Sequence, residues 1–228
     1  VGLGVTGYHY FLLKAGFKYG DENCLEFTER LFTTIRNEAY KASMYLAKEK
    51  GSFEAYDWAK LKNEKFFKTL PSRIRSDIKK NGLRNAILLT VAPTGTVSMV
   101  LGVSTGIEPI FAPVYKRRWR TGTDGVWYDV RPEEHIKTQA LIQTFIDSAV
   151  SKTCNLPADF QSETLFDELL NHASDMKGFT FYRAGSRGNE PLEIIDHSTL
   201  DLDRLIQEGN IEELAQSVET CKDGTCEL

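Results

Sequence analysis

The stretch VAPTGTVS places small polar residues between two apolar segments. Residues 86–92 are apolar and β-branched, as in a buried strand, and residues 97–103 are typical of a short helix. The turn between them holds Thr94, Gly95 and Thr96. Free backbone N–H groups at the start of a helix attract anions, glycine permits a close approach, and hydroxyl groups add donors. The turn therefore suits a phosphate group, although Thr96 acting as a simple helix N-cap explains the same residues.

A pair of cysteines near the C-terminus is a second chemical signal. Cys221 and Cys226 are separated by four residues, and Asp223-Gly224 between them favours a tight turn that brings the thiols together. Two thiols in an exposed segment can exchange with another dithiol. A zinc site needs about four ligands, and the nearest histidine, His197, is far upstream, so zinc is disfavoured. Two incidental exposed thiols remain the alternative.

Three further groups of residues are weaker candidates. Tyr182 stands at the end of an apolar strand, where α/β folds place functional side chains, but a core tyrosine is the commoner case. Cys24 and Cys154 fall in a helix and a strand, which indicates buried, inert thiols. The run YKRRWR (residues 115–120) could grip a nucleotide, although a solvated hairpin face explains it better.

Composition limits the class of protein. The 228 residues are enough for one large domain or two small ones, and 41% of them are apolar and 26% charged, as in an ordinary globular protein. A net charge of -4 gives no basic field for nucleic acid. No apolar run approaches the roughly 20 residues that span a bilayer, and no signal peptide is evident. Four cysteines are too few for a disulfide scaffold, so a reducing cytoplasm is the expected location.

Periodic apolar residues predict helices separated by strands. The longest helix follows Asp21 as its N-cap and ends near Gly51, a typical helix terminator. Its predicted apolar stripe consists of Leu25, Leu31, Ile35, Ala39, Ala42 and Leu46. Other helices are predicted over residues 8–15, 71–81, 97–103, 134–150 and 162–176, and strands over residues 1–5, 86–92, 151–156 and 178–183.

The alternation of strands and helices predicts an α/β fold with parallel strands. Residues 52–70 are expected to form a loop with a helical turn, and residues 110–134 an exposed hairpin or loop. Beyond them the sequence becomes acidic and weakly patterned. The predicted organisation is therefore a folded domain over residues 1–187 and a flexible tail over residues 188–228 that carries the cysteine pair.

A set of motifs in this order resembles the C-terminal part of the large, catalytic subunit of ribonucleotide reductase. They are GLGVTG (2–7), EAYKAS (38–43), GLRNA (82–86), APTGTVS (92–98), STGIEPIF (104–111), SKTCNLP (151–157), FYRAGSR (181–187) and the terminal cysteine pair. No single motif is specific, but the set spans nearly the whole chain and is specific when taken together.

The resemblance implies both a fold and a site. The fold is the second half of a ten-stranded α/β barrel. In the family, the turn that matches residues 93–97 holds the phosphates of the substrate at a helix N-terminus, which favours phosphate binding over a simple N-cap. The substrate-binding residues predicted on this basis are Pro93, Thr94, Gly95, Thr96, Val97 and Ser98. Tyr182 is a further candidate to line the active site. Cys221 and Cys226 correspond to the dithiol that re-reduces an active-site disulfide and is itself reduced by thioredoxin or glutaredoxin.

The residues around Tyr182 bear on the branch of the family. The two-subunit (class I) branch has two adjacent tyrosines here, whereas Phe181 and Arg183 flank Tyr182, so a relay through stacked tyrosines is incomplete. PTGT, SKTCNLP and YRAGSR also resemble the adenosylcobalamin-dependent (class II) branch, and no C-terminal glycyl-radical motif is present. The ending CKDGTCEL, however, resembles the tail of the two-subunit branch. Adenosylcobalamin is the predicted cofactor.

The thiyl-radical cysteine of the family belongs upstream of Val1, since neither Cys24 nor Cys154 has its setting. The N-terminus itself begins in apolar sequence without Met, which suggests a cut through a larger fold. The expected protein is a fragment of a ribonucleoside di- or triphosphate reductase, inactive alone. Its expected partners are an N-terminal half, the ribonucleotide, thioredoxin or glutaredoxin, and a second copy in a homodimer, but neither nucleic acid nor a membrane. The alternatives are a class I large-subunit fragment and a non-catalytic nucleotide-binding or redox-relay module.

Overall fold

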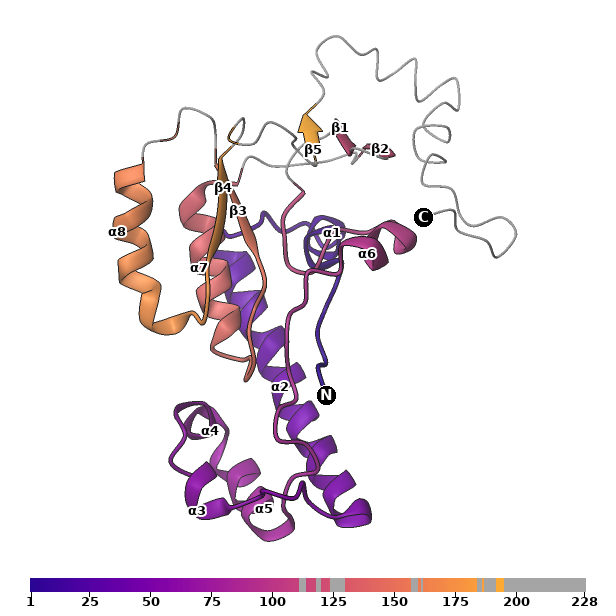
Figure 1. Ribbon diagram of the computed structural model, residues 1–228, viewed down its shortest axis with the longest axis vertical. Coiled ribbons are helices and arrows are strands. Elements are labelled where there is room, and N and C mark those ends of the chain that lie inside the picture. The colour runs from indigo at the N-terminus through magenta and orange to yellow at the C-terminus, as the bar shows by residue number, and fades with distance from the viewer. Residues whose placement is uncertain are drawn as a thin grey trace, which may run out of the picture.

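The structure, a computed structural model, describes residues 1–110, 114–117, 120–123, 130–156, 160, 162–183, 186 and 192–194. Its helices are α1 (Tyr8–Lys14), α2 (Glu22–Lys50), α3 (Trp58–Leu61), α4 (Lys65–Thr69), α5 (Ser72–Asn81), α6 (Gly95–Leu101), α7 (Pro132–Gln143), α8 (Ser162–His172) and the 3-10 helix η1 (Ala173–Asp175). Its strands are β1 (Val114–Arg117), β2 (Arg120–Thr123), β3 (Thr153–Leu156), β4 (Thr180–Arg183) and β5 (Leu192–Ile194). Helix α2 runs between a lower group of helices, α3 to α5, and the other elements above (Figure 1).

Parallel chain segments form the centre of the fold. Leu3 bridges Leu89, Val91 bridges Val150, and β3 pairs in parallel with β4 over four residue pairs. The predicted α/β class with parallel pairing is therefore confirmed. The predicted strands over residues 1–5 and 86–92, however, form single bridges and not extended ladders.

The glycines beside Leu3 explain why its pairing is so short. Glycine has no side chain to pack and weakens a strand. A Cβ on Gly4 would lie 2.1 Å from the carbonyl oxygen of Thr90, and one on Gly2 would lie 2.8 Å from the Cγ2 of Thr90. The glycines therefore allow the two segments to approach closely at Thr90.

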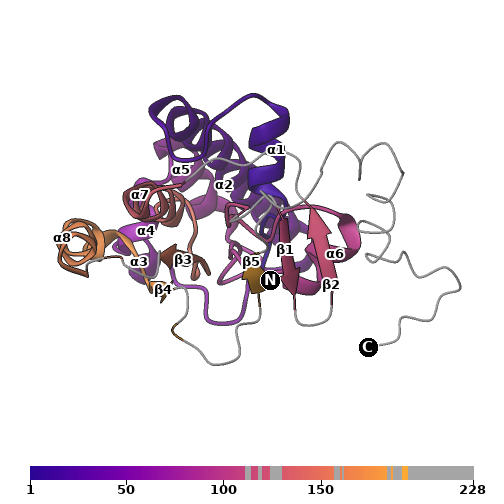
Figure 2. The same ribbon diagram turned by 90° about the horizontal axis from the view of Figure 1, so that it is seen from above.

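The predicted hairpin after residue 110 is present. β1 pairs with β2 antiparallel from Val114–Thr123 to Arg117–Arg120, and β5 pairs on the other side of β1. Seen from above, α7 and α8 lie on one side of the molecule, and α6 lies with this hairpin on the other side (Figure 2).

Helix α2 begins and ends where the sequence predicts. Its N-cap Asp21 accepts a hydrogen bond from the Cys24 N–H at 2.8 Å, and its C-cap Gly51 has a φ of 78°, which favours glycine. The buried face of the helix nevertheless differs from the predicted stripe. The buried side chains are Cys24, Thr28, Phe32, Arg36, Tyr40, Ser43, Met44 and Ala47. The predicted members Ala42 and Leu46 are exposed.

Three other predicted helices end or begin at different residues. Helix α6 begins at Gly95, two residues before the predicted start. Helix α7 ends at Gln143 and not near residue 150, because the chain turns there and joins the sheet at Val150. The predicted helix over residues 162–176 ends as α8 at His172 and continues as η1. Residues 52–70 hold two short helices, α3 and α4, where one helical turn was predicted.

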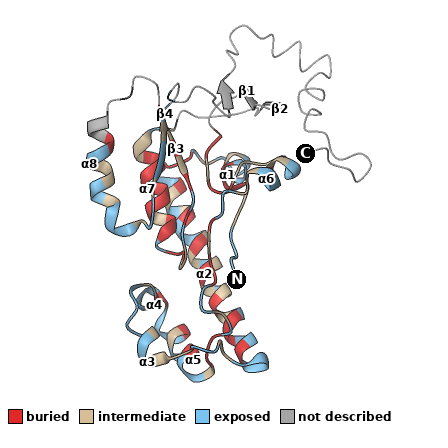
Figure 3. Cartoon of the chain, viewed as in Figure 1, coloured by how far each residue is buried: buried red, intermediate tan, exposed pale blue. Residues whose placement is uncertain are grey.

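Two apolar clusters hold these elements together. The larger lies mainly around α2 and includes Tyr8, Phe32, Tyr40, Leu89 and Ile107. The smaller packs α7, α8 and β3 together and consists of Ile136, Cys154, Leu156 and Leu165. Buried residues concentrate where α2 and α7 meet the strands, whereas α6 is mostly exposed (Figure 3). None of the helices that the structure describes is both long and apolar enough to cross a bilayer.

Candidate functional site

Three loops meet where the parallel segments 1–5 and 86–92 end. The hydroxyl oxygens of Thr6 and Thr94 lie 2.9 Å apart, in hydrogen-bond contact. The Gly106 N–H donates to the hydroxyl of Thr94 at 2.8 Å and to that of Thr6 at 3.3 Å. The Gly7 N–H donates to the Ser104 carbonyl at 2.7 Å. Ligands of α/β folds bind at the carboxyl ends of parallel strands, so this junction is a candidate binding site.

Thr94 holds an uncommon backbone conformation at this junction. Its φ of 51° and ψ of 29° lie in the left-handed region, and no other non-glycine residue that the structure describes has a positive φ. A β-branched residue is strained there, typically by about 1–3 kcal/mol, and such strain persists where surrounding contacts enforce it. The bonds from Thr6 and Gly106 supply those contacts, so they fix the direction in which α6 begins.

The first turn of helix α6 has no side-chain cap. Thr94 is its N-cap and makes no side-chain capping bond. The alternative in which Thr96 is the N-cap is therefore wrong, since Thr96 lies inside the first turn. The first N–H groups of any helix lack a partner within the helix. Because Pro93, Thr96 and Val97 are exposed, a ligand can reach this end of α6.

Not every residue predicted to bind phosphate has a side chain that a ligand can reach. Ser98 is buried, and its hydroxyl donates to the Gly95 carbonyl at 3.0 Å. Its backbone N–H donates to the Thr94 carbonyl at 2.9 Å. Ser98 therefore closes the first turn, and the hydroxyl of Thr94 is engaged by its neighbours. Thr96 is the hydroxyl residue of the turn that faces solvent.

Tyr182 lies apart from this junction. It sits on β4 opposite Asn155 of β3 and is partly buried. Figures 1 and 2 place β4 on the side of α7 and α8, whereas α6 lies on the opposite side. The structure therefore does not bring Tyr182 together with the turn at residues 93–98. Cys221, Cys226 and the side chains of residues 115–120 lie outside the described residues.

The structure places two of the four cysteines in the interior, as predicted. Cys24 and Cys154 are free and buried. Burial raises the pKa of the Cys154 thiol to about 11, although the nearby amine of Lys152 acts in the opposite direction. A thiol that stays protonated and inaccessible is unreactive. Neither cysteine therefore suits exchange chemistry.

A buried cluster of bases was not predicted. His9, His135 and Lys152 gather around the ring of Tyr19, with the Lys152 amine 5.8 Å from the ring centre and in contact with His135 Nδ1. Burial lowers the pKa of Lys152 to about 7, of His9 to about 4 and of His135 to about 2. Lys152 adds to the last shift, because a neighbouring cation disfavours imidazolium. These residues are distant in sequence, so no local pattern marks them.

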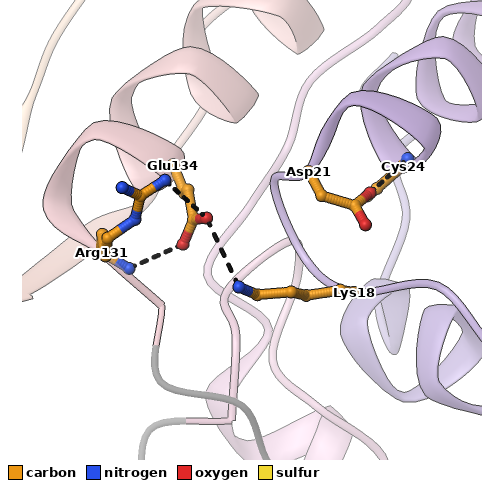
Figure 4. Close-up of polar contacts among 5 residues, drawn as sticks. All are labelled: Lys18, Asp21, Cys24, Arg131 and Glu134. Atoms are coloured by element: carbon orange, nitrogen blue, oxygen red, sulfur yellow. Dashed lines mark hydrogen bonds and ion pairs between the residues drawn. The ribbon is translucent and has the colours of Figure 1, made fainter.

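A second polar group joins the loop before α2 to the start of α7 (Figure 4). The carboxylate of Glu134 is buried and accepts the Arg131 backbone N–H at 2.8 Å and its guanidinium at 3.2 Å, with the Lys18 amine 3.9 Å away. Gly20 permits this contact, because a Cβ there would lie 2.6 Å from that of Glu134. The group holds α7 against the loop and so supports the fold.

The parallel α/β arrangement, in which loops meet at the ends of strands, is typical of domains that bind their ligands at the carboxyl edge of a sheet. More specifically, residues 1–127 match the family described as "Ribonucleotide reductase, barrel domain". The chain belongs to this family. The predicted resemblance and the barrel-type α/β fold are thereby confirmed.

Several named proteins are similar to the chain. The vitamin B12-dependent ribonucleoside-diphosphate reductase of Mycobacterium tuberculosis (strain CDC 1551 / Oshkosh) is 29% identical over 241 residues, which cover 84% of this chain and 32% of that protein. Ribonucleoside-diphosphate reductase subunit alpha of Treponema pallidum is 34% identical over 116 residues, 48% of this chain and 14% of that protein. The class Id ribonucleotide reductase alpha subunit of Actinobacillus ureae shares the fold, with a TM-score of 0.59 at 19% identity over 81% of this chain and 39% of that chain.

The chain spans about a third of the length of the first of these relatives. It therefore corresponds to a part of a reductase large subunit.

Proposed function

We propose that this chain supplies the substrate-phosphate site and the C-terminal dithiol of a ribonucleoside di- or triphosphate reductase. The observation that carries the proposal is the turn at residues 93–97 of this family member. The turn follows a parallel segment and leads into α6, whose first turn has no side-chain cap. A helix start of this kind attracts an anion through its N–H groups and its dipole.

The geometry assigns separate tasks to the residues of the turn. Thr94 sets the backbone direction through its left-handed conformation and its bonds to Thr6 and Gly106. Gly95 adds no side chain at the first helical position, so a phosphate can approach the backbone. Thr96 can donate its exposed hydroxyl. These contacts position the nucleotide and hold its charge; the radical chemistry belongs to residues outside this chain.

A charge placed in the first turn tests this role. Thr96→Glu should repel a phosphate while it favours the positive end of the α6 dipole, so the KM for nucleotide should rise at least about tenfold without loss of folding stability. Ser72→Glu is the matched control, because Ser72 is an exposed hydroxyl residue in the first turn of α5, at the other end of the molecule. Both variants are assayed in the assembled reductase. Equal KM values for the two variants would count against a phosphate site at residues 93–97.

The proposal extends to the cysteine pair and its reductant. Cys221 and Cys226 act as a shuttle that reduces the active-site disulfide and is then reduced by thioredoxin or glutaredoxin. Support comes from their spacing around a predicted turn and from the contrast with Cys24 and Cys154, which are buried and cannot exchange. The reductant enters as a dithiol and leaves as a disulfide, so the two electrons of each turnover are accounted for.

We also propose adenosylcobalamin as the radical source of the assembled enzyme. The support is that two relatives of this chain are named as vitamin B12-dependent, together with the sequence FYR, in which Tyr182 lacks a tyrosine neighbour. The groove beside α2 does not suit the cofactor itself. A corrin ring carries polar amide arms, whereas the groove beside α2 measures about 400 Å³ and is lined mainly by aliphatic side chains such as Leu3 and Leu46. We assign its binding to the part of the reductase that this chain does not span.

The alternative is a two-subunit reductase, which several relatives named as alpha subunits favour. Activity that requires a second, metal-containing protein and ignores adenosylcobalamin would select it. In either case the chain needs the rest of the barrel, because its own sequence contains no match to the family's thiyl-radical cysteine. We expect the reaction to take place in the cytoplasm and the assembled enzyme to form a homodimer.

A further inference from the structure

The parallel pairing beside the turn at residues 93–97 stops at a defined point. The carbonyl of Val91 accepts the Ser151 N–H at 2.8 Å. N–H groups on one edge of a strand recur at every second residue, so the next one in this direction belongs to Thr153. Pro93 has no N–H to continue the ladder, and the chain leaves the sheet at Thr94 to begin α6. The Thr153 N–H therefore needs another acceptor.

A carboxylate from the loop at residues 103–110, which follows α6, takes that place. Glu108 Oε1 accepts the Thr153 N–H at 2.9 Å, and Glu108 Oε2 accepts the Thr105 hydroxyl at 3.2 Å. The Glu108 N–H also donates to the Thr105 carbonyl at 2.8 Å, so these two residues close a turn. Both carboxylate oxygens are thus bound by the protein, and Glu108 joins the start of β3 to this loop.

The same loop contacts the turn at residues 93–97. The Gly106 N–H donates to the hydroxyl of Thr94 at 2.8 Å. Gly106 has a φ of 46°, and a Cβ there would lie 3.0 Å from the carbonyl oxygen of Ala92, so the loop lies directly against the end of the parallel segment. Because Gly106 is two residues before Glu108, the attachment to β3 and the contact with Thr94 belong to one short piece of backbone.

Two buried side chains hold the backbone on the other side of this piece. The Tyr19 hydroxyl donates to the Ile107 carbonyl at 2.7 Å, and the Ile110 N–H donates to His9 Nδ1 at 2.7 Å. Burial lowers the pKa of His9 to about 4, so His9 is neutral near pH 7, as an acceptor at Nδ1 must be. The loop is therefore fixed to the core beyond Glu108, and a change at Glu108 is transmitted toward Gly106 and the turn.

We propose that Glu108 is a positioning residue for the phosphate of the nucleotide. It replaces the strand partner that is lost at Pro93, and through Thr105 and Gly106 it sets the position of the turn that begins α6. The inference rests on the proposed function, because it names a residue that supports the phosphate site proposed there. Glu108 is not itself a ligand, since a carboxylate repels a phosphate and both of its oxygens have protein partners.

Removing the carboxylate tests this role in the assembled reductase. Glu108→Ala should raise the KM for nucleotide by about fivefold or more and change kcat by less than about twofold, because a displaced turn weakens the binding of substrate and transition state alike. Glu108→Gln should restore most of the affinity, since its amide can accept the Thr153 N–H and donate to the Thr105 hydroxyl. Asp57→Ala is the matched control. The Asp57 carboxylate is also partly buried and accepts the Ala59 N–H at 2.8 Å, but it lies at the start of α3, among the lower helices in Figure 1.

Hydrogen exchange gives a readout that does not depend on turnover. In the assembled reductase without nucleotide, Glu108→Ala should speed exchange in peptides across residues 93–101 by about threefold or more, whereas Asp57→Ala should not. Thr105→Val is a second variant for the case in which Glu108→Ala does not fold. It removes one of the two contacts of the carboxylate with little change in shape, so exchange and KM should both rise by a smaller factor.

The outcomes separate this inference from the proposed function. Unchanged exchange at residues 93–101 in the Glu108 and Thr105 variants would overturn the inference. An unchanged KM in these variants would also overturn it where Thr96→Glu raises the KM, because the phosphate site would then exist without support from Glu108. Failure of Glu108→Gln to restore the KM, or a fall in kcat alone, would likewise overturn it. If Thr96→Glu also leaves the KM unchanged, the phosphate site itself is refuted, and the role of Glu108 in nucleotide binding with it.

Discussion

At the scale of single residues, Lys152 is a buried amine in contact with an imidazole. Its relative exposure is 2%, and the groups that face it are His135, Tyr19, Glu108 and Cys154. Burial disfavours the charged amine and lowers its pKa to about 7, although the two acidic groups act in the opposite direction. Lys152 can therefore be neutral in the folded protein near neutral pH.

This shift predicts how stability depends on pH. The folded-state pKa is about 7 and the unfolded value is about 10.5, so between them the unfolded chain binds more protons and stability rises with pH. From pH 7 to 8.5 the gain should reach up to about 2 kcal/mol. Urea unfolding at several pH values measures it, and comparison with Lys152→Met separates it from the ionisation of thiols in the unfolded chain, which begins in the same pH range. Lys152→Met should abolish the rise, and an unchanged slope in that variant would assign the effect to another group.

The cysteine pair makes a second prediction at this scale. Replacing Cys221 and Cys226 with serine should abolish multiple turnover with thioredoxin, because the shuttle is lost, while a small dithiol that diffuses to the active site should still support turnover. Thermal unfolding should be nearly unchanged. Full thioredoxin-driven turnover by the double variant would show that the two thiols are incidental.

At the scale of elements, one carboxylate joins α2 to the central segments. Asp147 accepts the Tyr40 hydroxyl of α2 at 2.6 Å and the backbone N–H groups of Leu88 and Leu89 at 2.8 and 2.7 Å. Because Leu88 and Leu89 are buried, their N–H groups have little access to water as a substitute. Asp147 therefore fixes the segment that leads into the turn at residues 93–97.

Removing this carboxylate should cost more than removing its partner. Asp147→Ala leaves three donors without an acceptor and should lower the free energy of unfolding by roughly 3 kcal/mol, whereas Tyr40→Phe removes one hydrogen bond and should cost about 1 kcal/mol. Denaturant titration of both variants gives the comparison. Equal losses would mean that the backbone contacts contribute little.

The elements also show what the sequence can predict. Asp21 and Gly51 cap α2 through contacts with residues close to them in sequence, so the ends of this helix can be predicted from local sequence. The start of α6 cannot be predicted in this way, because the left-handed conformation of Thr94 is held by a hydrogen bond to Thr6, which is 88 residues away in the sequence. The cluster of His9, His135 and Lys152 was missed for the same reason. The predicted stripe of α2 is wrong at Ala42 and Leu46, which are exposed, because the spacing of apolar residues alone does not say which face of a helix meets the core.

At the scale of the whole molecule, the described residues form two apolar clusters around parallel segments. The larger cluster packs α1, α2 and the central segments together. We expect the chain to fold alone and bind nucleotide weakly, because the proposed phosphate contacts come from a single turn, residues 93–97.

The central claim is that the chain contributes phosphate binding and a dithiol to a reductase that it cannot form alone. The most direct test measures deoxyribonucleotide formation, with thioredoxin and adenosylcobalamin present, by the chain alone, by the remaining part of the reductase alone, and by the two together. We predict product only when both are present, and only with adenosylcobalamin. Turnover by the chain alone, or by the remaining part without it, would contradict the account.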